Sequence, residues 1–551
     1  MITRLEVDGV PAVLAPVSGP THAGLVFRVG TADEPLPRRG ITRLVQHLVT
    51  DGPGTTGPEH TYFHVQGSAA EITERLTGVC AALRDPPAGR LTAVRDRLLN
   101  TPPDRDPLPM WRYGARGFGV ASYPEWALAG LTEEHLRYWI ARYFTRENAA
   151  LWVAGDAIPE GLRLDLPSGE RQPAPAAVTA LPATPAWFSG PGGGTAWDTV
   201  VRREARAAVF ANVLERRMLH DLRRLDGISG QARTEYVPRS DGTARILAVA
   251  DARPEEQEAV LGGMIDVLAA MRAGQIGPDE VAGVVELTCE GLRESESRGA
   301  RLPGQAFNLL AGRDIPTLDE ALDEVRAVTV EDVAGVASSA YDAGLLMTPR
   351  GSTAGWAGYT AAPVMSDTVL PGRAHRGRKD RGLRLISGDE GVSVTGAGLV
   401  ATVRWDSCAA LLAWPDGGRR LIGHDAVAAR IEPTLYRDAG RVVAEVDARI
   451  PEHLRIEMPA RDRDRIPQPE PPAREDGRQP LPVLLLFGVL ALFFLGGGLW
   501  VVGRLLAGAA GPGGTLENTL VVASAVLFGG FFGRLALAGL RERRAAGTPP
   551  P

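Results

Sequence analysis

Residues 27–49 read FRVGTADEPLPRRGITRLVQHLV and join a strand-like run to a helix-like run through a short loop. An apolar run ends at Gly30, and from Ile41 the apolar residues recur at helical spacing. We therefore predict a strand that ends near Gly30 and a helix that begins just after Gly40. This helix carries one histidine, His47, and its neighbours decide whether that histidine belongs to an active site.

The composition indicates a globular protein of several domains. The chain has 551 residues, 44% hydrophobic and 23% charged, which corresponds to three or four domains. Its formal net charge is −6 and it contains no long basic block, so nucleic acid is not an expected partner. Lys379 is the only lysine, and the abundance of Arg, Gly, Pro and Ala is typical of a GC-rich bacterial genome.

The three cysteines are too dispersed for a disulfide framework. Cys80, Cys289 and Cys408 lie far apart and form no Cys-x-x-Cys pair. We expect buried free thiols in a reducing compartment, with neither a disulfide nor a cysteine-rich zinc site.

The C-terminal part contains two apolar stretches long enough to cross a membrane. Residues 481–503 carry no charge, and residues 516–540 form a second stretch of similar length. The N-terminus lacks the features of a signal peptide. Arginines precede the first span and follow the second (Arg474, Arg478, Arg541, Arg543 and Arg544). The positive-inside rule then predicts a two-pass protein of the cell membrane, with both termini and the soluble domains cytoplasmic.

Pro/Gly-rich stretches divide the soluble part into blocks. The predicted boundaries are a first domain at 1–156, a linker at 157–196, a second domain at 197–347, a linker at 348–381, a β-rich module at 382–458 and a charged, Pro-rich tether at 459–480. The sequence Pro-Asp-Gly-Gly at 415–418 predicts a hairpin turn in the β-rich module. That module is a candidate pleckstrin-homology-like barrel.

The first two blocks follow one plan. Thr132 and Thr329 each stand before a predicted helix as N-caps, and each helix runs to a tyrosine that precedes a short apolar strand. Internal similarity on this scale indicates a duplication.

Residues 1–347 resemble the insulinase-like (M16, inverted zincin) metallopeptidases. The family signature is a strand ending in Val-Gly, an acidic residue, a glycine, and a helix with His-x-x-Glu-His; the matching positions are Val29, Gly30, Glu34, Gly40 and His47. Segments 61–68, 143–156 and 274–286 resemble other family elements in the same order. The resemblance implies an α+β fold with two repeated α/β domains, followed here by the β-rich module and two transmembrane helices.

The residues that would perform the family's chemistry are changed. In the family, two histidines one turn apart bind zinc, the intervening Glu is the general base, and a Glu on a later helix completes the ligands. Arg43 occupies the first histidine position and Gln46 the base position, and the later helix, 91–103, ends in Asn100 and Thr101. A guanidinium cannot coordinate Zn²⁺. The resemblance therefore implies a pseudoenzyme with no catalytic residue, no metal and no cofactor.

Other arrangements of the same side chains remain open. His60 and His64 lie on a predicted strand, where a spacing of four separates them by about 13 Å. Asp51 and Glu59 could regroup with His60 around a metal. His47 is expected to be a hydrogen-bonded structural residue, and it would be a ligand only in an atypical site. Arg43 could pair with a nearby carboxylate (Glu34 or Asp33) and fill the former cleft.

Three functions follow from these observations. The first is a membrane-anchored, non-catalytic M16 subunit that binds peptides or partners with an insulinase-like catalytic subunit or a second copy of itself. The second is an active zinc peptidase with unusual ligands. The third is a structural organiser of a membrane complex, built around the β-rich module and the two spans.

Overall fold

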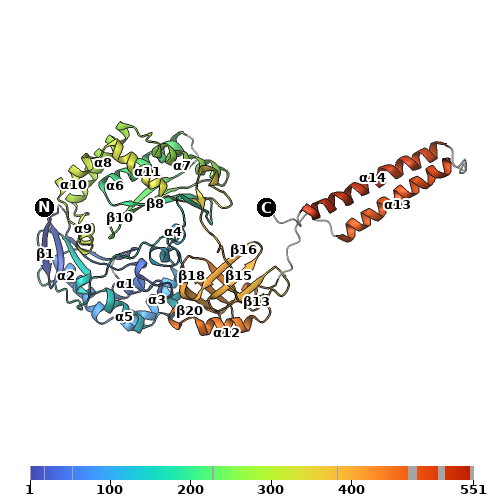
Figure 1. The fold of residues 1–551 in the computed structure, drawn as a ribbon. Helices are drawn as coiled ribbons and strands as arrows, with labels where there is room; N and C mark the ends of the chain where they lie inside the picture. Colours follow the sequence, from blue (N-terminus) through green and yellow to red (C-terminus); the bar gives the residue numbers. More distant parts are fainter. Residues whose placement is uncertain are drawn as a thin grey trace. The chain divides into compact units, whose positions relative to one another are not determined.

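The computed structural model describes residues 2–17, 19–51, 54–225, 229–380, 382–469, 481–506 and 515–545 (Figure 1). The chain divides into two compact units, Met1–Gln468 and Pro469–Pro551. The first unit contains the two repeated domains and the β-rich module, and the second contains a helical hairpin.

The first domain is a six-stranded sheet with helices packed on one face. Its strand order is β1-β2-β6-β3-β5-β4, so that β1 and β4 are the edges. The strands are β1 (Thr3–Val7), β2 (Val10–Ala15), β3 (His22–Phe27), β4 (Gly54–Thr56), β5 (Thr61–Gln66) and β6 (Ala149–Ala154). The helices are α1 (Ile41–Val49), α2 (Ala69–Arg84), α3 (Leu91–Asn100), α4 (Leu108–Tyr113) and α5 (Glu133–Tyr143).

The second domain repeats this arrangement. Its strand order is β12-β7-β11-β8-β10-β9. The strands are β7 (Ala186–Ser189), β8 (Thr195–Arg202), β9 (Ala232–Pro238), β10 (Thr243–Ala250), β11 (Leu345–Thr348) and β12 (Thr360–Ala361). The helices are α6 (Ala205–Met218), α7 (Gln257–Arg272), α8 (Pro278–Ser297), α9 (Leu302–Leu310), α10 (Leu318–Arg326) and α11 (Val330–Asp342).

The predicted duplication is confirmed by strand pairing. In each sheet one strand pair near the middle is parallel, β2 with β6 and β7 with β11, and three further strands follow in antiparallel order, β3-β5-β4 and β8-β10-β9. Only the edge strands beyond these pairs differ, because β1 is antiparallel to β2 and β12 is parallel to β7. Thr132 and Thr329 cap α5 and α11, since their hydroxyl oxygens accept hydrogen bonds from the backbone N–H groups of His135 and Asp332.

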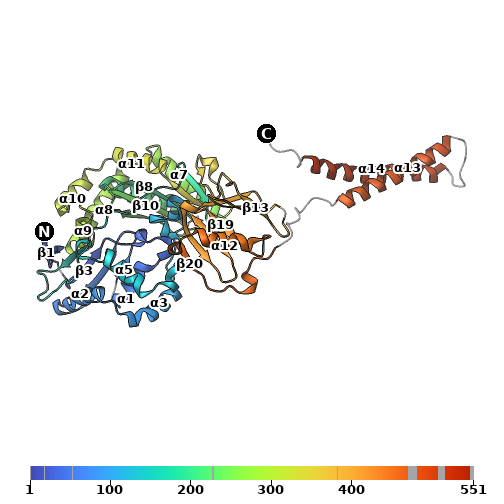
Figure 2. The ribbon, with the colours of Figure 1, turned by 60° about the horizontal axis from the view of Figure 1, so that its bottom comes forward.

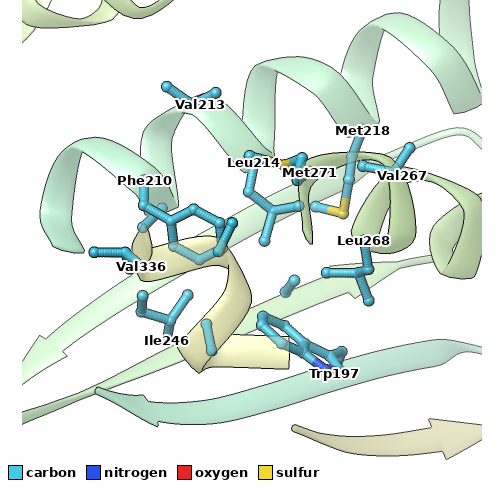
Figure 3. Close-up of a cluster of buried hydrophobic side chains, with 14 of the residues drawn as sticks. Trp197, Phe210, Val213, Leu214, Met218, Ile246, Val267, Leu268, Met271 and Val336 are labelled. Atoms are coloured by element: carbon cyan, nitrogen blue, oxygen red, sulfur yellow. The ribbon is translucent and has the colours of Figure 1, made fainter. Parts of the chain in front are cut away.

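Apolar side chains fill the space between sheet and helices in both repeats. In the second domain, Trp197 of β8 lies under Phe210 and Leu214 of α6 and Leu268 of α7 (Figure 3). The opposite face of the first sheet is covered by α9, whose Phe307 packs in one apolar cluster with residues of β2, β3 and β6. Because α9 belongs to the second repeat by sequence, the two repeats share a core.

A buried ionic network also joins the repeats. The Arg112 guanidinium of α4 donates to the Asp198 carboxylate of β8 at 2.9 Å and 2.5 Å, and Arg245 of β10 donates to the same carboxylate at 2.9 Å. Arg245 also pairs with Asp106 at 2.6 Å. The two arginines hold the pKa of fully buried Asp198 below its usual value, although burial alone would raise it.

Both predicted linkers contain strands. Strand β7 and the start of β8 lie within 157–196, so the second domain begins before residue 197. Strand β12 lies within 348–381 and pairs with β7, so the second sheet extends past residue 347. These strands are short and stand in Pro/Gly-rich sequence, which is why composition alone assigned them to linkers.

The β-rich module contains two four-stranded sheets and a helix, and begins at β13 rather than at 382. Its strands are β13 (Arg373–Arg376), β14 (Arg384–Ser387), β15 (Gly391–Gly396), β16 (Leu399–Arg404), β17 (Cys408–Ala413), β18 (Arg419–Gly423), β19 (Ala428–Ile431) and β20 (Arg455–Glu457), and its helix is α12 (Ala439–Arg449). The orders are β13-β14-β15-β16 and β19-β18-β17-β20. The hairpin turn at 415–418 joins β17 to β18, as predicted. The pleckstrin-homology label stays a prediction.

The module packs against the first domain and continues into the predicted tether. Figure 2 shows β20 of the module beside the helices of the first domain. Leu412 of β17 and Ile456 of β20 share an apolar cluster with Tyr123 and Trp126 of the first domain. Arg461, within the predicted tether, donates to the Glu432 carboxylate at 2.8 Å, so the start of the tether is part of the module. Residues 470–480, including Arg474 and Arg478, lie outside the described residues.

The second unit is a pair of apolar helices, α13 (Leu481–Leu506) and α14 (Thr515–Ala545). Each contains a segment long and apolar enough to cross a membrane, Val483–Arg504 and Leu520–Ala538. These segments coincide with most of the two predicted spans.

Candidate functional site

Helix α1 begins where the sequence predicts, and a buried carboxylate fixes its first turn. Gly40 adopts a φ of 97°, a conformation that few other residues reach without strain, and Ile41 starts the helix. The Glu34 carboxylate accepts hydrogen bonds from the backbone N–H groups of Gly40 and Thr42, both at 2.9 Å, and pairs with Arg39 at 3.0 Å. Glu34 therefore serves as the N-terminal anchor of this helix.

Burial raises the pKa of Glu34, and the Arg39 charge together with the two backbone hydrogen bonds opposes that rise. All the oxygen contacts of Glu34 face the helix start. The match of Glu34 and Gly40 to the peptidase signature thus has a local structural cause.

Arg43, at the position predicted for the first zinc ligand, is held by Glu125. Its Nε donates to Glu125 Oε1 at 3.1 Å, and its NH2 group makes a second, closer contact with Glu125 Oε2. The same guanidinium reaches the carbonyl oxygens of Leu98 and Thr101 at the end of α3, each at 3.4 Å. The bidentate geometry makes this a strong, oriented pair.

The partner of Arg43 differs from the expected one. We predicted Glu34 or Asp33, but Glu34 pairs with Arg39, and Asp33 pairs with Arg28 at 2.6 Å. Those carboxylates lie in the loop before α1 and are already saturated by nearer arginines. Glu125 approaches from a segment 82 residues further along the chain.

Gln46, at the position predicted for the general base, is buried. Its side chain is 2% exposed, and its Nε2 has no hydrogen-bond partner within the described residues. A Cβ atom added to Gly54 of β4 would lie 2.5 Å from that Nε2, so the amide is enclosed by the neighbouring strand. An amide in this place cannot accept a proton at neutral pH.

His47 is half-buried, and its pKa is lowered by burial and by the charges of Arg43 and Arg97. The hydrogen bond predicted for its ring is not formed with any described residue. The Glu125 and Asp51 carboxylates partly oppose this lowering of the His47 pKa.

The other candidate ligands point to separate partners. Asp51 pairs with Arg90, and Glu59 accepts a hydrogen bond from the backbone N–H of Ser240 at 3.1 Å. The His60 ring packs against Phe307 at 5.0 Å between centroids, and the His64 ring stacks on Trp152 at 5.4 Å. Within the described ranges, no group of three or more His, Cys, Asp or Glu side chains is arranged to hold a metal ion.

The zinc ion of an M16 site does not fit the residues at α1. The position predicted for the first ligand holds a cation paired to Glu125, and the position predicted for the base holds an enclosed amide. A single imidazole cannot complete a four-coordinate zinc site. No catalytic step through a metal is derived for this arrangement.

Glu125 is the residue that sequence analysis missed. It stands just before the 3₁₀ turn η5 (Trp126–Gly130), whose Trp126 contacts the β-rich module. No local pattern distinguishes Glu125 from other surface carboxylates. Only the packing of the η5 segment between α1 and the module brings it to Arg43.

Comparisons with solved structures define the fold. A protease from Helicobacter pylori has a TM-score of 0.52 and 14% identity over 63% of this chain and 100% of its own. A peptidase M16 inactive domain from Pseudomonas fluorescens has a TM-score of 0.53 and 14% identity over 64% and 98%. The first half of the periplasmic protease PqqL from Escherichia coli has a TM-score of 0.50 and 12% identity over 64% and 92%. The chain has the M16 peptidase fold.

The M16 fold accounts for the two repeated domains, which the sequence resemblance predicted. No protein-family model and no curated protein matches the sequence. At these identities the likeness concerns the fold, and the chemistry has to be argued from the side chains at α1.

Proposed function

We propose that this chain is a membrane-anchored, non-catalytic subunit of M16 fold that binds a peptide segment or a partner chain. The observation that carries the proposal is the bidentate pair between Arg43 and Glu125, because the sequence resemblance predicts the first metal ligand at position 43. The two apolar C-terminal helices support the anchoring. The partner would be an M16-type catalytic subunit or a second copy of this chain.

The open edge of the first sheet is the site that we assign to the bound segment. Strand β4 is an edge strand beside α1, and Gly57 N–H donates to the His60 carbonyl at 2.8 Å. Because the donors alternate along an antiparallel strand, the N–H groups of Thr56 and Gly54 point away from β5. An extended peptide can add to such an edge through backbone hydrogen bonds.

The absence of hydrolysis is tested with the full chain in detergent or nanodiscs. We expect no stoichiometric zinc by elemental analysis after zinc loading and dialysis, and no cleavage of a peptide library. Zinc at one equivalent, together with peptide cleavage that is abolished by Gln46→Ala, would refute the proposal and favour the active-peptidase alternative.

Binding at the β4 edge is tested by removing one outward-facing donor. Thr56→Pro deletes an N–H that points to the open edge and leaves the ladder to β5 intact. The matched control is Arg4→Pro at the opposite edge of the sheet. Asp8 and Gly9 form a two-residue turn, so Val7 and Val10 are a hydrogen-bonded pair, and the N–H groups of β1 then alternate in direction. The N–H of Arg4, three residues before Val7, therefore points away from β2. We expect Thr56→Pro to weaken capture of peptides or a partner, and Arg4→Pro to leave it unchanged.

The organiser function predicts the opposite result. If the repeated domains only support the module and the membrane hairpin, partner capture should survive Thr56→Pro. Deletion of 382–458 is a poor substitute for this test, because it would expose the apolar cluster that Tyr123 and Trp126 form with the module.

A further inference from the structure

Three arginines form a row across adjacent backbone segments of the β-rich module. Arg376 of β13 lies directly opposite Arg384 of β14 in the antiparallel ladder. On the other side of β13, Arg437 N–H donates to the Arg376 carbonyl at 3.0 Å, and the neighbouring residues Gly377 and Tyr436 form an antiparallel bridge. Arg437 therefore lies opposite Arg376, and the three residues occupy one line across the sheet edge.

All three side chains project from the outer face. Residues that are directly opposite in antiparallel strands point to the same side, and successive residues alternate. The adjacent pair, His375 and Leu385, is buried and marks the inner face. Arg376, Arg384 and Arg437 are exposed.

Further cations extend the row into a basic patch. We define the basic patch as the exposed residues Arg373, Arg376, Arg378, Lys379, Arg384, Arg437 and Arg441. Among the described residues, none of the seven forms an ion pair with a carboxylate. The nearest acidic side chains have other contacts: Asp380 accepts from Gly382 N–H at 2.7 Å, and Glu445 accepts from Ser387 Oγ at 2.9 Å. Asp438 stands at the start of α12 and makes no capping hydrogen bond.

This local charge contrasts with that of the whole chain, which has 60 basic and 66 acidic residues. Like charges directly opposite one another destabilise a strand pair. The Arg384–Arg376–Arg437 row carries that cost with no internal compensation, so an external anionic surface would relieve it.

We propose that the basic patch binds the headgroups of anionic phospholipids at the surface of the membrane that holds the hairpin. A row of exposed guanidiniums on the outer face of a sheet suits an extended anionic surface, and arginine pairs well with phosphate. Residues 469–481 connect the module to α13 and span at most about 40 Å. A connection of this length allows the patch to reach the membrane surface.

The inference rests on the proposed membrane anchoring, and one experiment separates the two. The full chain is reconstituted into nanodiscs of phosphatidylcholine alone or with phosphatidylglycerol. A donor dye is attached at Val369→Cys, an exposed position beside the patch, and an acceptor dye is placed on the lipid. The three native cysteines are buried, so the new thiol is labelled selectively. Failure of the chain to co-elute with nanodiscs would refute the anchoring alone.

Wild-type protein should show higher energy transfer in the anionic nanodiscs. The excess should vanish as salt shortens the Debye length from about 30 Å to about 3 Å. A Lys or Arg near an anionic surface contributes roughly a fivefold preference. Combined Arg376→Gln, Arg384→Gln and Arg437→Gln should therefore lower the equilibrium constant for surface contact by on the order of 100-fold.

The matched control removes three exposed arginines outside the module, Arg4→Gln, Arg75→Gln and Arg233→Gln, and should keep the lipid dependence. The control variant should unfold at the wild-type temperature, and the patch variant should unfold at that temperature or slightly above it, because it loses the repulsion within the row. Equal energy transfer in the two lipids, or lipid dependence that persists in the patch variant, would overturn the proposal. A third result would also overturn it: the wild-type protein binds soluble polyglutamate in neutral nanodiscs, and its energy transfer does not depend on the lipid. This result would indicate that the patch binds an acidic protein instead of a membrane.

Discussion

Arg43 of α1 and Glu125 of the segment before η5 form a bidentate ion pair across 82 residues of sequence, with Arg43 Nε 3.1 Å from Glu125 Oε1. Both side chains are largely buried, at 16% and 7% exposure. The pair places a permanent cation at the position that the sequence resemblance predicts for the first zinc ligand, and the Glu125 carboxylate neutralises that cation.

Restoring the motif should restore metal binding. Arg43→His combined with Gln46→Glu leaves the Glu125 carboxylate with only its longer contact to Arg39 at 3.4 Å. It also places two imidazoles, those of the new histidine and His47, one turn apart on α1. We expect the double variant to bind close to one equivalent of zinc by elemental analysis, and the wild type to bind none. Adding Glu125→Ala to the double variant should abolish that zinc; if it does not, Glu125 is not positioned as a ligand.

Gln46→Met should stabilise the protein. The Gln46 Nε2 is buried without a partner in the described structure, and such a group costs about 1–3 kcal/mol. Methionine has a similar volume and no donor. We expect the apparent Tm in detergent, followed by intrinsic fluorescence, to rise by on the order of 2 °C. A fall in Tm would mean that the amide has a stabilising contact.

Asp198→Ala should be severely destabilising. The substitution leaves Arg112 and Arg245 buried without their shared carboxylate, and breaking a buried ion pair costs about 3–5 kcal/mol. The control is Asp165→Ala, which removes the exposed partner of Arg84 and should cost at most about 1 kcal/mol. Equal effects in chemical denaturation would show that the network does not join the repeats as described.

His60 should make the fold acid-sensitive. Burial and the Arg28 charge lower its folded pKa to about 4, from 6.5 for a free histidine. Between these values the unfolded chain binds a proton that the folded chain excludes, so stability falls as the pH drops. The loss is at most about 3 kcal/mol and is complete near pH 4.

The comparison is between His60→Asn and the exposed control His453→Asn, with Tm measured across the interval from pH 6.5 to 4. The first variant should lose less stability on acidification than the second. The buried carboxylates contribute equally to the pH dependence of stability in both variants. The difference between the two pH profiles therefore reports the contribution of His60 alone. Parallel pH profiles would contradict the prediction.

Features that depend on neighbouring residues were predictable from the sequence. The start of α1 after Gly40, the caps Thr132 and Thr329, and the turn at 415–418 are set by local backbone preferences and apolar spacing. The repeated order of elements in the two domains and the two apolar C-terminal helices follow from the same apolar spacing and backbone preferences, read over longer stretches of sequence. Short strands such as β7 and β12 were missed because pairing with their neighbours, rather than composition, makes them strands.

The sequence by itself determined that Arg43 cannot coordinate a metal ion and that Gln46 cannot act as a base, since the chemistry of a guanidinium and an amide is independent of their surroundings. Only the tertiary structure decided that Glu125 neutralises Arg43, that Arg112 shares Asp198 with Arg245, and that Arg384, Arg376 and Arg437 stand in one row. Each of these relationships joins residues that are far apart in the chain or that are brought opposite one another by the register of paired strands. Electrostatic pairing falls off within a few ångströms, so the packing that brings such segments together selects the partners.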